Sequence, residues 1–359
     1  FNALALTLIV IILIFTIVEP ITAYFYPQYP ELVLMFFYYS LTTIALLPYL
    51  QFNYILQANL DFKGSFWSSL THKGMLFIYI FYHYWNGIII DIFEMSLFLI
   101  LAASAASIVG YFFVKKYLIF SKSIDWKWVK ELFHFGKFTF GTNISTIVYK
   151  FTDRTMVGIM VGVDAISIYE VAIRITNLVD IPAISIAAVV FPQNAKNSLK
   201  QDKDSIREVY EKSVAAILGL IIPVIFFIYF FAELVIIILG REEYLDSVPI
   251  LRVTIFFALF VPFALQFGTI LDSIGKPKIN FRFVILGLIL NLIFNYLLIK
   301  EYGMMGAVYG TLLTYALMFL IQMSFFYKWY HVRPWKPFTL IPWFYKNLLI
   351  TILDFLKKK

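Results

Sequence analysis

The sequence predicts an all-α polytopic membrane protein, with two helical-bundle lobes around a central cavity and about ten spans present. Three observations lead to this fold class. The 359 residues are 61% hydrophobic and 14% charged, with a mean hydropathy of +0.83, which excludes a soluble globular protein. Apolar runs of ~20 residues, long enough to cross a bilayer as a helix, recur along the chain. Lysine and arginine gather in alternate loops between these runs, as the positive-inside rule requires.

Ten candidate spans follow from the apolar runs. They cover residues 3–25, 32–52, 66–88, 92–114, 136–161, 164–192, 213–239, 248–272, 279–299 and 303–328. The third span is the weakest, because it contains two histidines, a lysine and an asparagine. The apolar stretch near the C-terminus is shorter than a span, so we expect an interfacial helix or part of a further span there.

The basic residues set the orientation of these spans. Twenty-three lysines and arginines fall in one set of loops or at their edges, and three fall in the opposite set. We therefore place the basic set in the cytoplasm. The net charge of +7 is then a signal of membrane topology, and we expect no nucleic-acid partner, because there is no basic soluble domain to bind one.

The longest polar connection divides the chain into two lobes. We expect an incomplete N-terminal lobe of four spans at 1–114 and a cytoplasmic amphipathic linker at 115–135. A C-terminal lobe of six spans follows at 136–328, and 329–359 is a basic tail or the start of a further span.

An internal echo relates the two lobes. The sequence QFNYIL at 51–56 recurs as QFGTIL at 266–271, and each copy closes a span that contains a proline, Pro48 or Pro262. A basic loop follows each copy. The match aligns the second span with the eighth and indicates a duplication. It also predicts that two further spans precede Phe1.

Two consecutive spans, within 136–192, are unusual because they contain charged side chains. Apart from Lys137 and Asp164 at the span ends, these are Lys150, Asp153, Arg154, Glu170, Arg174 and Asp180. A charge near the bilayer centre costs roughly 2.5–3.5 kcal/mol on insertion scales. The six charges therefore predict that these helices line a water-filled cavity.

Helical spacing arranges the polar residues of the two spans in stripes. The first stripe contains Thr139, Asn143, Thr146, Lys150 and Asp153/Arg154, and the second contains Glu170, Arg174, Asn177 and Asp180. Our hypothesis is that Arg154 pairs with Glu170 while Lys150 and Arg174 remain free to hold an anion. The alternative is that all six charges, which sum to zero, neutralise one another as structural ion pairs.

These stripes supply the candidate site residues. For substrate binding they are Lys150, Arg154, Arg174, Asn143 and Asn177, and for ion coupling, proton coupling or pairing they are Asp153, Glu170 and Asp180. The chain has no cysteine, and its four histidines lack metal-ligand spacing. We therefore expect no catalytic residue, no metal and no cofactor, and we do not expect an enzyme.

Two groups of residues resemble a known family. The first is Asp153…Gly158…Gly162…Tyr169-Glu170-Val171-Ala172…Arg174-Ile175, ending in Phe191-Pro192, and the second is Gly275-Lys276-Pro277-Lys278, Asn291…Asn295, Tyr302-Gly303-Met304-Met305-Gly306-Ala307 and Thr311. Both resemble the polysaccharide flippases, the O-antigen and capsule exporters of the multidrug/oligosaccharidyl-lipid/polysaccharide superfamily. The sequence departs from the family pattern at Ser167, where glycine is usual, and at Lys300, where proline is frequent.

The resemblance implies two six-helix lobes and alternating access. It implies a substrate, a polyprenyl-pyrophosphate-linked oligosaccharide, that moves from the cytoplasmic to the outer leaflet of a prokaryotic cell (inner/plasma) membrane. Membrane lipids and polysaccharide polymerase machinery are the other implied partners. One alternative is an ion-coupled multidrug or organic-cation antiporter of the same superfamily, which needs an uncompensated acidic site. Another is a membrane polysaccharide polymerase, which needs large loops with carboxylates or histidines.

Overall fold

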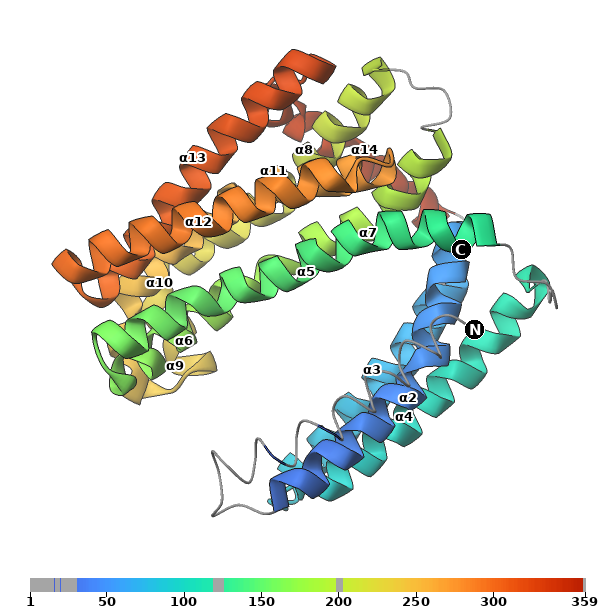
Figure 1. Cartoon of the computed structure of the whole chain (residues 1–359), viewed down its shortest axis with the longest axis horizontal. Helices are drawn as coiled ribbons and strands as arrows, with labels where there is room; N and C mark the ends of the chain where they lie inside the picture. The colour runs from blue at the N-terminus through green and yellow to red at the C-terminus, as the bar shows by residue number, and fades with distance from the viewer. Residues whose placement is uncertain (1–15, 17–19, 21–30, 119–125, 198–202, 358–359) are drawn as a thin grey trace. The chain divides into compact units, whose positions relative to one another are not determined.

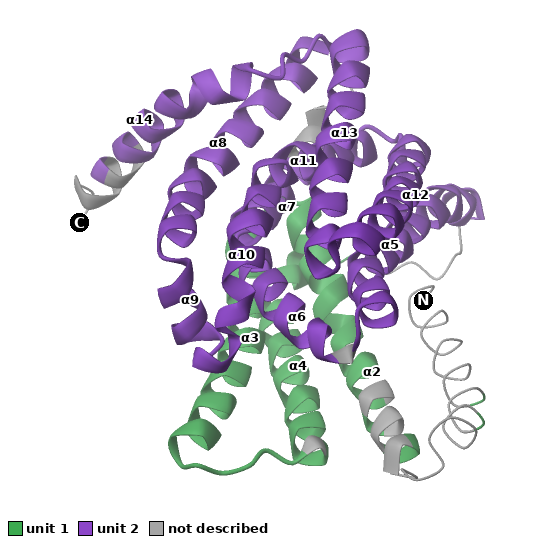
Figure 2. Cartoon of the chain, turned by 90° about the vertical axis from the view of Figure 1, so that its left-hand side faces the viewer, with its two compact units in different colours: residues 1–123 green, residues 124–359 purple. Residues whose placement is uncertain are grey.

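The computed structural model describes residues 16, 20, 31–118, 126–197 and 203–357 (Figure 1). The described residues contain helices, turns and no strand, which confirms the predicted all-α class. The chain divides into two compact units, residues 1–123 and 124–359, coloured separately in Figure 2. The first predicted span, 3–25, lies outside the described residues except for two positions.

Unit 1 is a bundle of three described long helices. They are α2 (Glu31–Ala58), α3 (Phe62–Trp85) and α4 (Ile92–Val114), followed by a short 3-10 turn, η1 (Lys115–Tyr117). Asp61 caps α3 by accepting the Gly64 N–H at 3.1 Å, and Asp91 caps α4 by accepting the Glu94 N–H. All three helices pack on one another, and each overlaps a predicted span.

Unit 2 contains the remaining helices. They are α5 (Trp126–Met160), α6 (Val163–Leu178), α7 (Ile181–Asn197), α8 (Lys203–Phe230), α9 (Ala232–Leu239), α10 (Val248–Thr254), α11 (Val261–Ser273), α12 (Pro277–Tyr302), α13 (Met304–Tyr330) and α14 (Lys336–Lys357), with 3-10 turns η3 (Glu242–Ser247) and η4 (Ile255–Leu259). At ~1.5 Å per residue, the 35 residues of α5 extend about 53 Å, longer than a ~30 Å hydrocarbon core. Its first turns, within the segment expected as a linker, continue the helix without a break.

Within the described residues, five helices are long and apolar enough to cross a membrane, or six if one bent pair counts as a span. That pair is α6 and α7, which were expected as one continuous span at 164–192 but bend by 44°. Pro182, the second residue of α7, has no N–H to continue the hydrogen-bond ladder of α6. Two further expected spans are also interrupted. Residues 213–239 are broken at Phe231, and 248–272 passes through η4 before Pro262 restarts the helix as α11.

An aromatic and aliphatic core holds the helices of unit 2 together. Tyr210, Phe263, Phe267 and Phe326 are almost completely buried, and the rings of Phe267 and Phe326 lie 4.4 Å apart. The α12 and α13 helices approach closely at Gly306, where a Cβ atom would lie 2.0 Å from a backbone carbonyl oxygen of α12. This core fixes α12 and α13, and α5 runs alongside α12 (Figure 1).

The structure supports the predicted internal echo. Helix α2 ends at Ala58 and α3 begins at Phe62, while α11 ends at Ser273 and α12 begins at Pro277. Both boundaries differ by 215 positions, the same offset that relates the two copies of the echoed sequence. The α2–α3 and α11–α12 turns are therefore equivalent elements in the two units.

The backbone of these two turns is also the same. Leu60 and Gly275, again 215 positions apart, both have positive φ, 58° and 76°. In each turn the following residue, Asp61 or Lys276, donates its N–H to the carbonyl five residues earlier at 2.8 Å. This is the pattern of a helix C-cap with one residue in the left-handed conformation. A residue with a Cβ is strained in this conformation, so Leu60 carries a cost that Gly275 avoids.

Polar contacts fasten the turn of unit 1 to η1 and the turn of unit 2 to the end of α13. In unit 1, Asp61 binds the Lys116 ammonium group at 2.8 Å and the Tyr117 hydroxyl at 3.2 Å. The hydrogen bond from Lys116, followed by that from the Gly64 N–H, lowers the pKa of Asp61. In unit 2, Lys276 donates to the Tyr330 hydroxyl at 3.0 Å.

We expect Gly275→Ala to lower the free energy of unfolding by about 1 kcal/mol, because a Cβ is unfavourable at positive φ. No heavy atom lies within 4 Å of the added Cβ, so the effect comes from the backbone alone. The control is Gly136→Ala on α5, which also has open space around the new Cβ and should be neutral or stabilising by up to ~1 kcal/mol. Thermal denaturation in detergent measures both. Equal effects of the two substitutions would contradict the assignment of strain to the turn.

Candidate functional site

The α5 helix carries two chemically different faces. One face contains Asp153, which points into the interior of unit 2 and is 7% exposed. The other, which we call the open face, contains Lys150, which is exposed, and Arg154, whose side chain is 22% exposed. The sequence placed Asp153 in the same stripe as Lys150, and this expectation is wrong. At about 100° per residue, Asp153 lies about 60° to one side of Lys150 and Arg154 about 40° to the other, and α12 and α13 pack on the Asp153 side.

Three neutral donors surround the Asp153 carboxylate. Asn295 Nδ2 donates to Oδ1 at 2.6 Å, Thr311 Oγ1 donates to Oδ2 at 2.9 Å, and Tyr169 Oη donates to Oδ2 at 3.2 Å. These donors come from α12, α13 and α6. Among the described residues, no lysine, arginine or histidine forms an ion pair with Asp153. The carboxylate is therefore buried with hydrogen-bond partners but without a counter-charge.

A second layer of hydrogen bonds orders these donors. Asn291 Nδ2 donates to Thr311 Oγ1 at 3.0 Å, and Asn291 Oδ1 accepts from Asn295 Nδ2 at 3.3 Å. Both asparagine side chains are fully buried. We refer to Asp153, Tyr169, Asn291, Asn295 and Thr311 as the Asp153 network. Burial of so many polar groups is stable only when most are paired, and the network pairs nearly all of them.

One oxygen of the Asp153 network has no donor. Asn295 Oδ1 is buried and unpartnered in the described part of the chain. It lies against Gly310, where an added Cβ would come within 2.3 Å of this oxygen. Gly310 therefore provides the space that the Asn295 amide occupies. The network presents carboxylate, amide and hydroxyl oxygens, the hard ligands that suit a monovalent cation or an added proton.

The open face of α5 and α6 holds an ion-pair cluster around Glu170. Arg154 Nε lies 2.5 Å from Glu170 Oε2, and Arg174 Nε donates to Glu170 Oε1 at 2.8 Å. The expected pair between Arg154 and Glu170 is present. Neither Arg154 Nε nor Glu170 Oε2 has a hydrogen-bond partner, so the contact is an ion pair and not a hydrogen bond. Arg174 was expected to be free. It binds Glu170 because the two residues are four apart on one helix, yet its side chain is 75% exposed.

The remaining candidates lie on or beside this open face. Lys150 is exposed and forms no ion pair with the residues that the structure describes, although it is within electrostatic range of Asp180. Asn143 and Asn177 are also exposed. Asp180 lies in the bend between α6 and α7 and so departs from the stripe expected on α6.

The burial of Asp153 changes the charge of the open face. These six charges sum to zero, but five of them are not buried: Lys150, Arg154, Arg174, Glu170 and Asp180. Among these five side chains, three cations outnumber two anions by one. The alternative in which all six charges neutralise one another does not describe the structure, because Asp153 has no cationic partner among the described residues.

The sequence marked Asn291, Asn295 and Thr311 as parts of a family-like pattern. It did not connect them with Asp153. The i, i+4 spacing of the two asparagines on an apolar helix was the available signal, because buried amides need a polar partner on a neighbouring helix. Among the described residues, no three histidines, aspartates or glutamates gather as metal ligands.

We expect Gly310→Ala to destabilise the protein by about 1–3 kcal/mol, because the methyl group must displace Asn295 or the α12 backbone. The matched control is Gly287→Ala on α12, where the nearest atom, Met318 Cγ, would lie 3.7 Å from the new Cβ. That contact is ordinary, so the control should not lose stability. Equal melting temperatures for the two variants would show that Asn295 does not need the space at Gly310.

Comparisons with known proteins agree with this architecture. A family model described as polysaccharide biosynthesis protein matches residues 1–249. An uncharacterized membrane protein of Methanocaldococcus jannaschii is 28% identical over 240 residues, covering 64% of this chain and 46% of the relative. A protein of Haloferax volcanii named as a probable low-salt glycan biosynthesis flippase, Agl15, is 26% identical over 195 residues, covering 54% of this chain and 41% of the relative. The chain thus spans less than half the length of these curated relatives.

Solved structures show the same fold at low sequence identity. An outward-facing multidrug resistance MATE family transporter of the MOP superfamily aligns with a TM-score of 0.73 and 17% identity, covering 96% of this chain and 78% of the other. A MOP superfamily transporter from Pyrococcus furiosus, described by a binding pocket of reverse polarity, aligns with a TM-score of 0.71 and 16% identity, covering 90% and 76%. The fold, the spanning helices and the membrane-protein relatives indicate a multi-pass membrane protein, and the family match confirms the resemblance found in the sequence. The chain belongs to the family of polysaccharide biosynthesis proteins.

Proposed function

We propose that this protein is a transporter that flips a lipid-pyrophosphate-linked oligosaccharide from the cytoplasmic to the outer leaflet by alternating access. The family match and a relative named as a glycan biosynthesis flippase support this function. The likeness to MATE family structures supports a transporter fold with two lobes. Membrane lipids and polysaccharide polymerase machinery are the other partners that this proposal requires.

The observation that carries the proposal is the excess of one positive charge among the five unburied candidate side chains on or beside the open face. A lysine or arginine facing lipid at mid-membrane would cost roughly 2.5–3.5 kcal/mol, so three such cations require an aqueous cavity. With Asp153 withdrawn into the interior, the face has three cations and two anions. A cavity of this charge attracts an anion such as a pyrophosphate and repels an organic cation.

The open-face residues have distinct proposed roles. Lys150, which has no ion-pair partner among the described residues, supplies a mobile point charge to the pyrophosphate. Arg174 can exchange Glu170 for the substrate, because its guanidinium group is exposed and held at one nitrogen. Arg154 remains paired with Glu170 and positions it. Asn143 and Asn177 offer amides to sugar hydroxyl groups.

The Asp153 network has the proposed role of coupling transport to a cation. A carboxylate buried without a counter-charge is costly unless it takes up a proton or a small cation. Its donors come from α6, α12 and α13, so a change in its charge alters contacts among four helices at once. Such a site can link ion binding to movement of the lobe.

An organic-cation antiporter is the second candidate, and the unpaired Asp153 is the observation that favours it. The MATE family likeness fits this function as well. However, Asp153 is 7% exposed and lies behind neutral side chains, so a bulky cation cannot reach it in this conformation. The open face would also repel a cation. We therefore favour the anionic substrate.

We expect Lys150→Ala in the full-length protein to weaken binding of a polyprenyl-pyrophosphate oligosaccharide roughly tenfold, because it removes one charge-assisted contact. The control Lys300→Ala removes an exposed lysine from the end of α12 and should leave affinity unchanged. Titration in detergent or nanodiscs measures both. An unchanged affinity in Lys150→Ala would remove Lys150 from the site. Absence of binding, together with gradient-driven uptake of an organic cation, would favour the antiporter.

We expect Asp153→Asn to retain substrate binding but to abolish the stimulation of flipping by a proton or sodium gradient, because the uncharged amide no longer binds the coupling cation. Flipping in proteoliposomes, with and without each gradient, measures this. Asp246→Asn, a surface substitution in η3, is the control and should keep the stimulation. Gradient-driven flipping that persists in Asp153→Asn would exclude the Asp153 network as the coupling site.

A further inference from the structure

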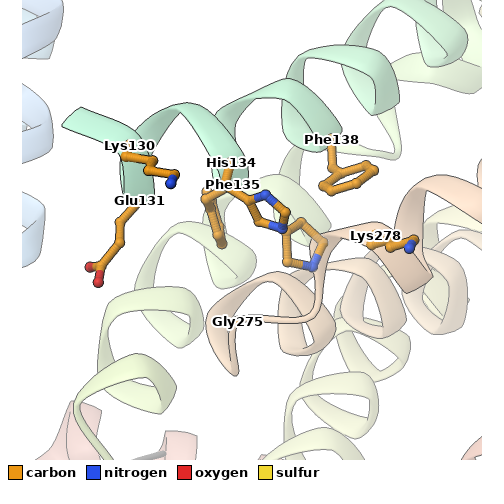
Figure 3. Close-up of a pocket in the computed structure, with 8 residues that line it drawn as sticks. Lys130, Glu131, His134, Phe135, Phe138, Gly275 and Lys278 are labelled. Atoms are coloured by element: carbon orange, nitrogen blue, oxygen red, sulfur yellow. The ribbon is translucent and has the colours of Figure 1, made fainter. Parts of the chain in front are cut away.

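A pocket on unit 2 lies apart from the α5–α6 face and the Asp153 network. It is a cavity of about 370 Å³ between the first turns of α5 and the α11–α12 turn. Lys130, His134, Phe135 and Phe138 line it from α5, and Gly275 and Lys278 line it from the turn and the start of α12. Figure 3 shows the His134 ring pointing from α5 toward the turn, with Lys130 on one side and Lys278 on the other.

The charge of this pocket is positive. Lys130 and Lys278 are exposed, and neither forms an ion pair with a described residue. The one acidic lining residue, Glu131, turns its carboxylate away from His134 and Lys278 in Figure 3. The positive end of the α12 dipole also lies at this pocket, because Lys278 is in the first turn of that 26-residue helix. Two unpaired cations and a helix N-terminus therefore converge on one cavity.

The walls of the pocket are suited to a lipid. Phe135 and Phe138 give it an apolar side. The His134 and Phe138 rings form a T-shaped pair, with their centroids 5.7 Å apart. Two exposed tryptophans, Trp126 and Trp128, begin the same helix. Exposed tryptophans of this kind mark the level of the headgroups in a bilayer. The distribution of basic residues places this level at the cytoplasmic leaflet.

We propose that this pocket binds the phosphate group of an anionic lipid in the cytoplasmic leaflet. Lys130 and Lys278 bind the phosphate from opposite sides, and the phenylalanines contact the glycerol or first isoprenoid carbons. The phosphate can come from an anionic phospholipid or from a polyprenyl diphosphate, which share this chemistry. The site does not depend on the proposed transport function, because any lipid phosphate satisfies it.

A lipid in this pocket would connect α5 with the α11–α12 turn. Asp153 lies on α5 itself, and the turn leads directly into α12, which carries Asn295. The α5 and α12 helices pack along one another. An occupied pocket thus fixes the cytoplasmic end of the same helix pair whose middle contains the Asp153 network. Lipid binding would stabilise unit 2 in addition to any role in transport.

The test is native mass spectrometry of the full-length protein with phosphatidylglycerol, with a polyprenyl diphosphate and with phosphatidylcholine. The variant is Lys130→Gln/Lys278→Gln. The control is Lys328→Gln/Lys346→Gln, which removes the same charge from exposed positions of the same unit that do not line the pocket. We expect the variant to bind the anionic lipid roughly thirtyfold more weakly than the wild type, and the control to stay within about twofold.

Each outcome decides the proposal. Lysine-dependent retention of phosphatidylglycerol supports the site and identifies phospholipid as its source, and retention of polyprenyl diphosphate alone identifies the transported class of lipid. Equal retention of the anionic lipids by the variant and the control overturns the proposal. It is also overturned if the variant loses phosphatidylcholine as strongly as it loses the anionic lipids, because that would indicate general damage. Thermal unfolding without added lipid checks the fold independently, and we expect the variant and the control to have the same melting temperature.

Discussion

The burial of one uncompensated carboxylate, Asp153, is the constraint on which much of unit 2 depends. An apolar bundle can hold such a group only if donors reach it, and these come from three other helices. The donors in turn require space, which Gly310 gives to Asn295. The polar side chains of the Asp153 network and the close contact at Gly310 therefore both serve to accommodate one buried charge.

Helical geometry lets α5 serve two purposes at neighbouring positions. Asp153 and Arg154 differ by about 100° around the helix axis, which is enough to send one inward and the other to the open face. The same helix thereby separates a negative interior from a positive surface. This separation, rather than the total charge of the segment, underlies the proposed preference for anions, because the six charges sum to zero and only the five on or beside the open face are unburied.

The sequence contained enough to predict the helical class, the equivalent turns, and the ion pair between Arg154 and Glu170. Each of these depends on local spacing or composition. The inward direction of Asp153 was not predictable. Helical spacing does not show whether a residue at the edge of a polar stripe faces the core when the helices that pack on it, α12 and α13, are distant in sequence. The bend between α6 and α7 could have been placed from Pro182, since proline early in a helix marks a break. The contact between Glu170 and Arg174 was predictable from their i, i+4 spacing on one helix. It was missed because Glu170 was expected to pair with Arg154 on the facing helix.

The two equivalent turns show how a duplicated element can diverge in charge while its backbone is kept. Both have a positive-φ residue at the equivalent position, Leu60 or Gly275, followed by a backbone hydrogen bond of 2.8 Å, so the turn geometry is set by hydrogen bonds that do not involve side chains. In unit 1 the position after the positive φ is Asp61, whose charge Lys116 compensates. In unit 2 it is Lys276, which bonds only the neutral Tyr330 hydroxyl among the described residues, and Lys278 follows it without an ion-pair partner there. The turn of unit 2 therefore keeps two positive side chains where the turn of unit 1 has a compensated carboxylate, and one of them, Lys278, lines the pocket for which we propose a lipid phosphate.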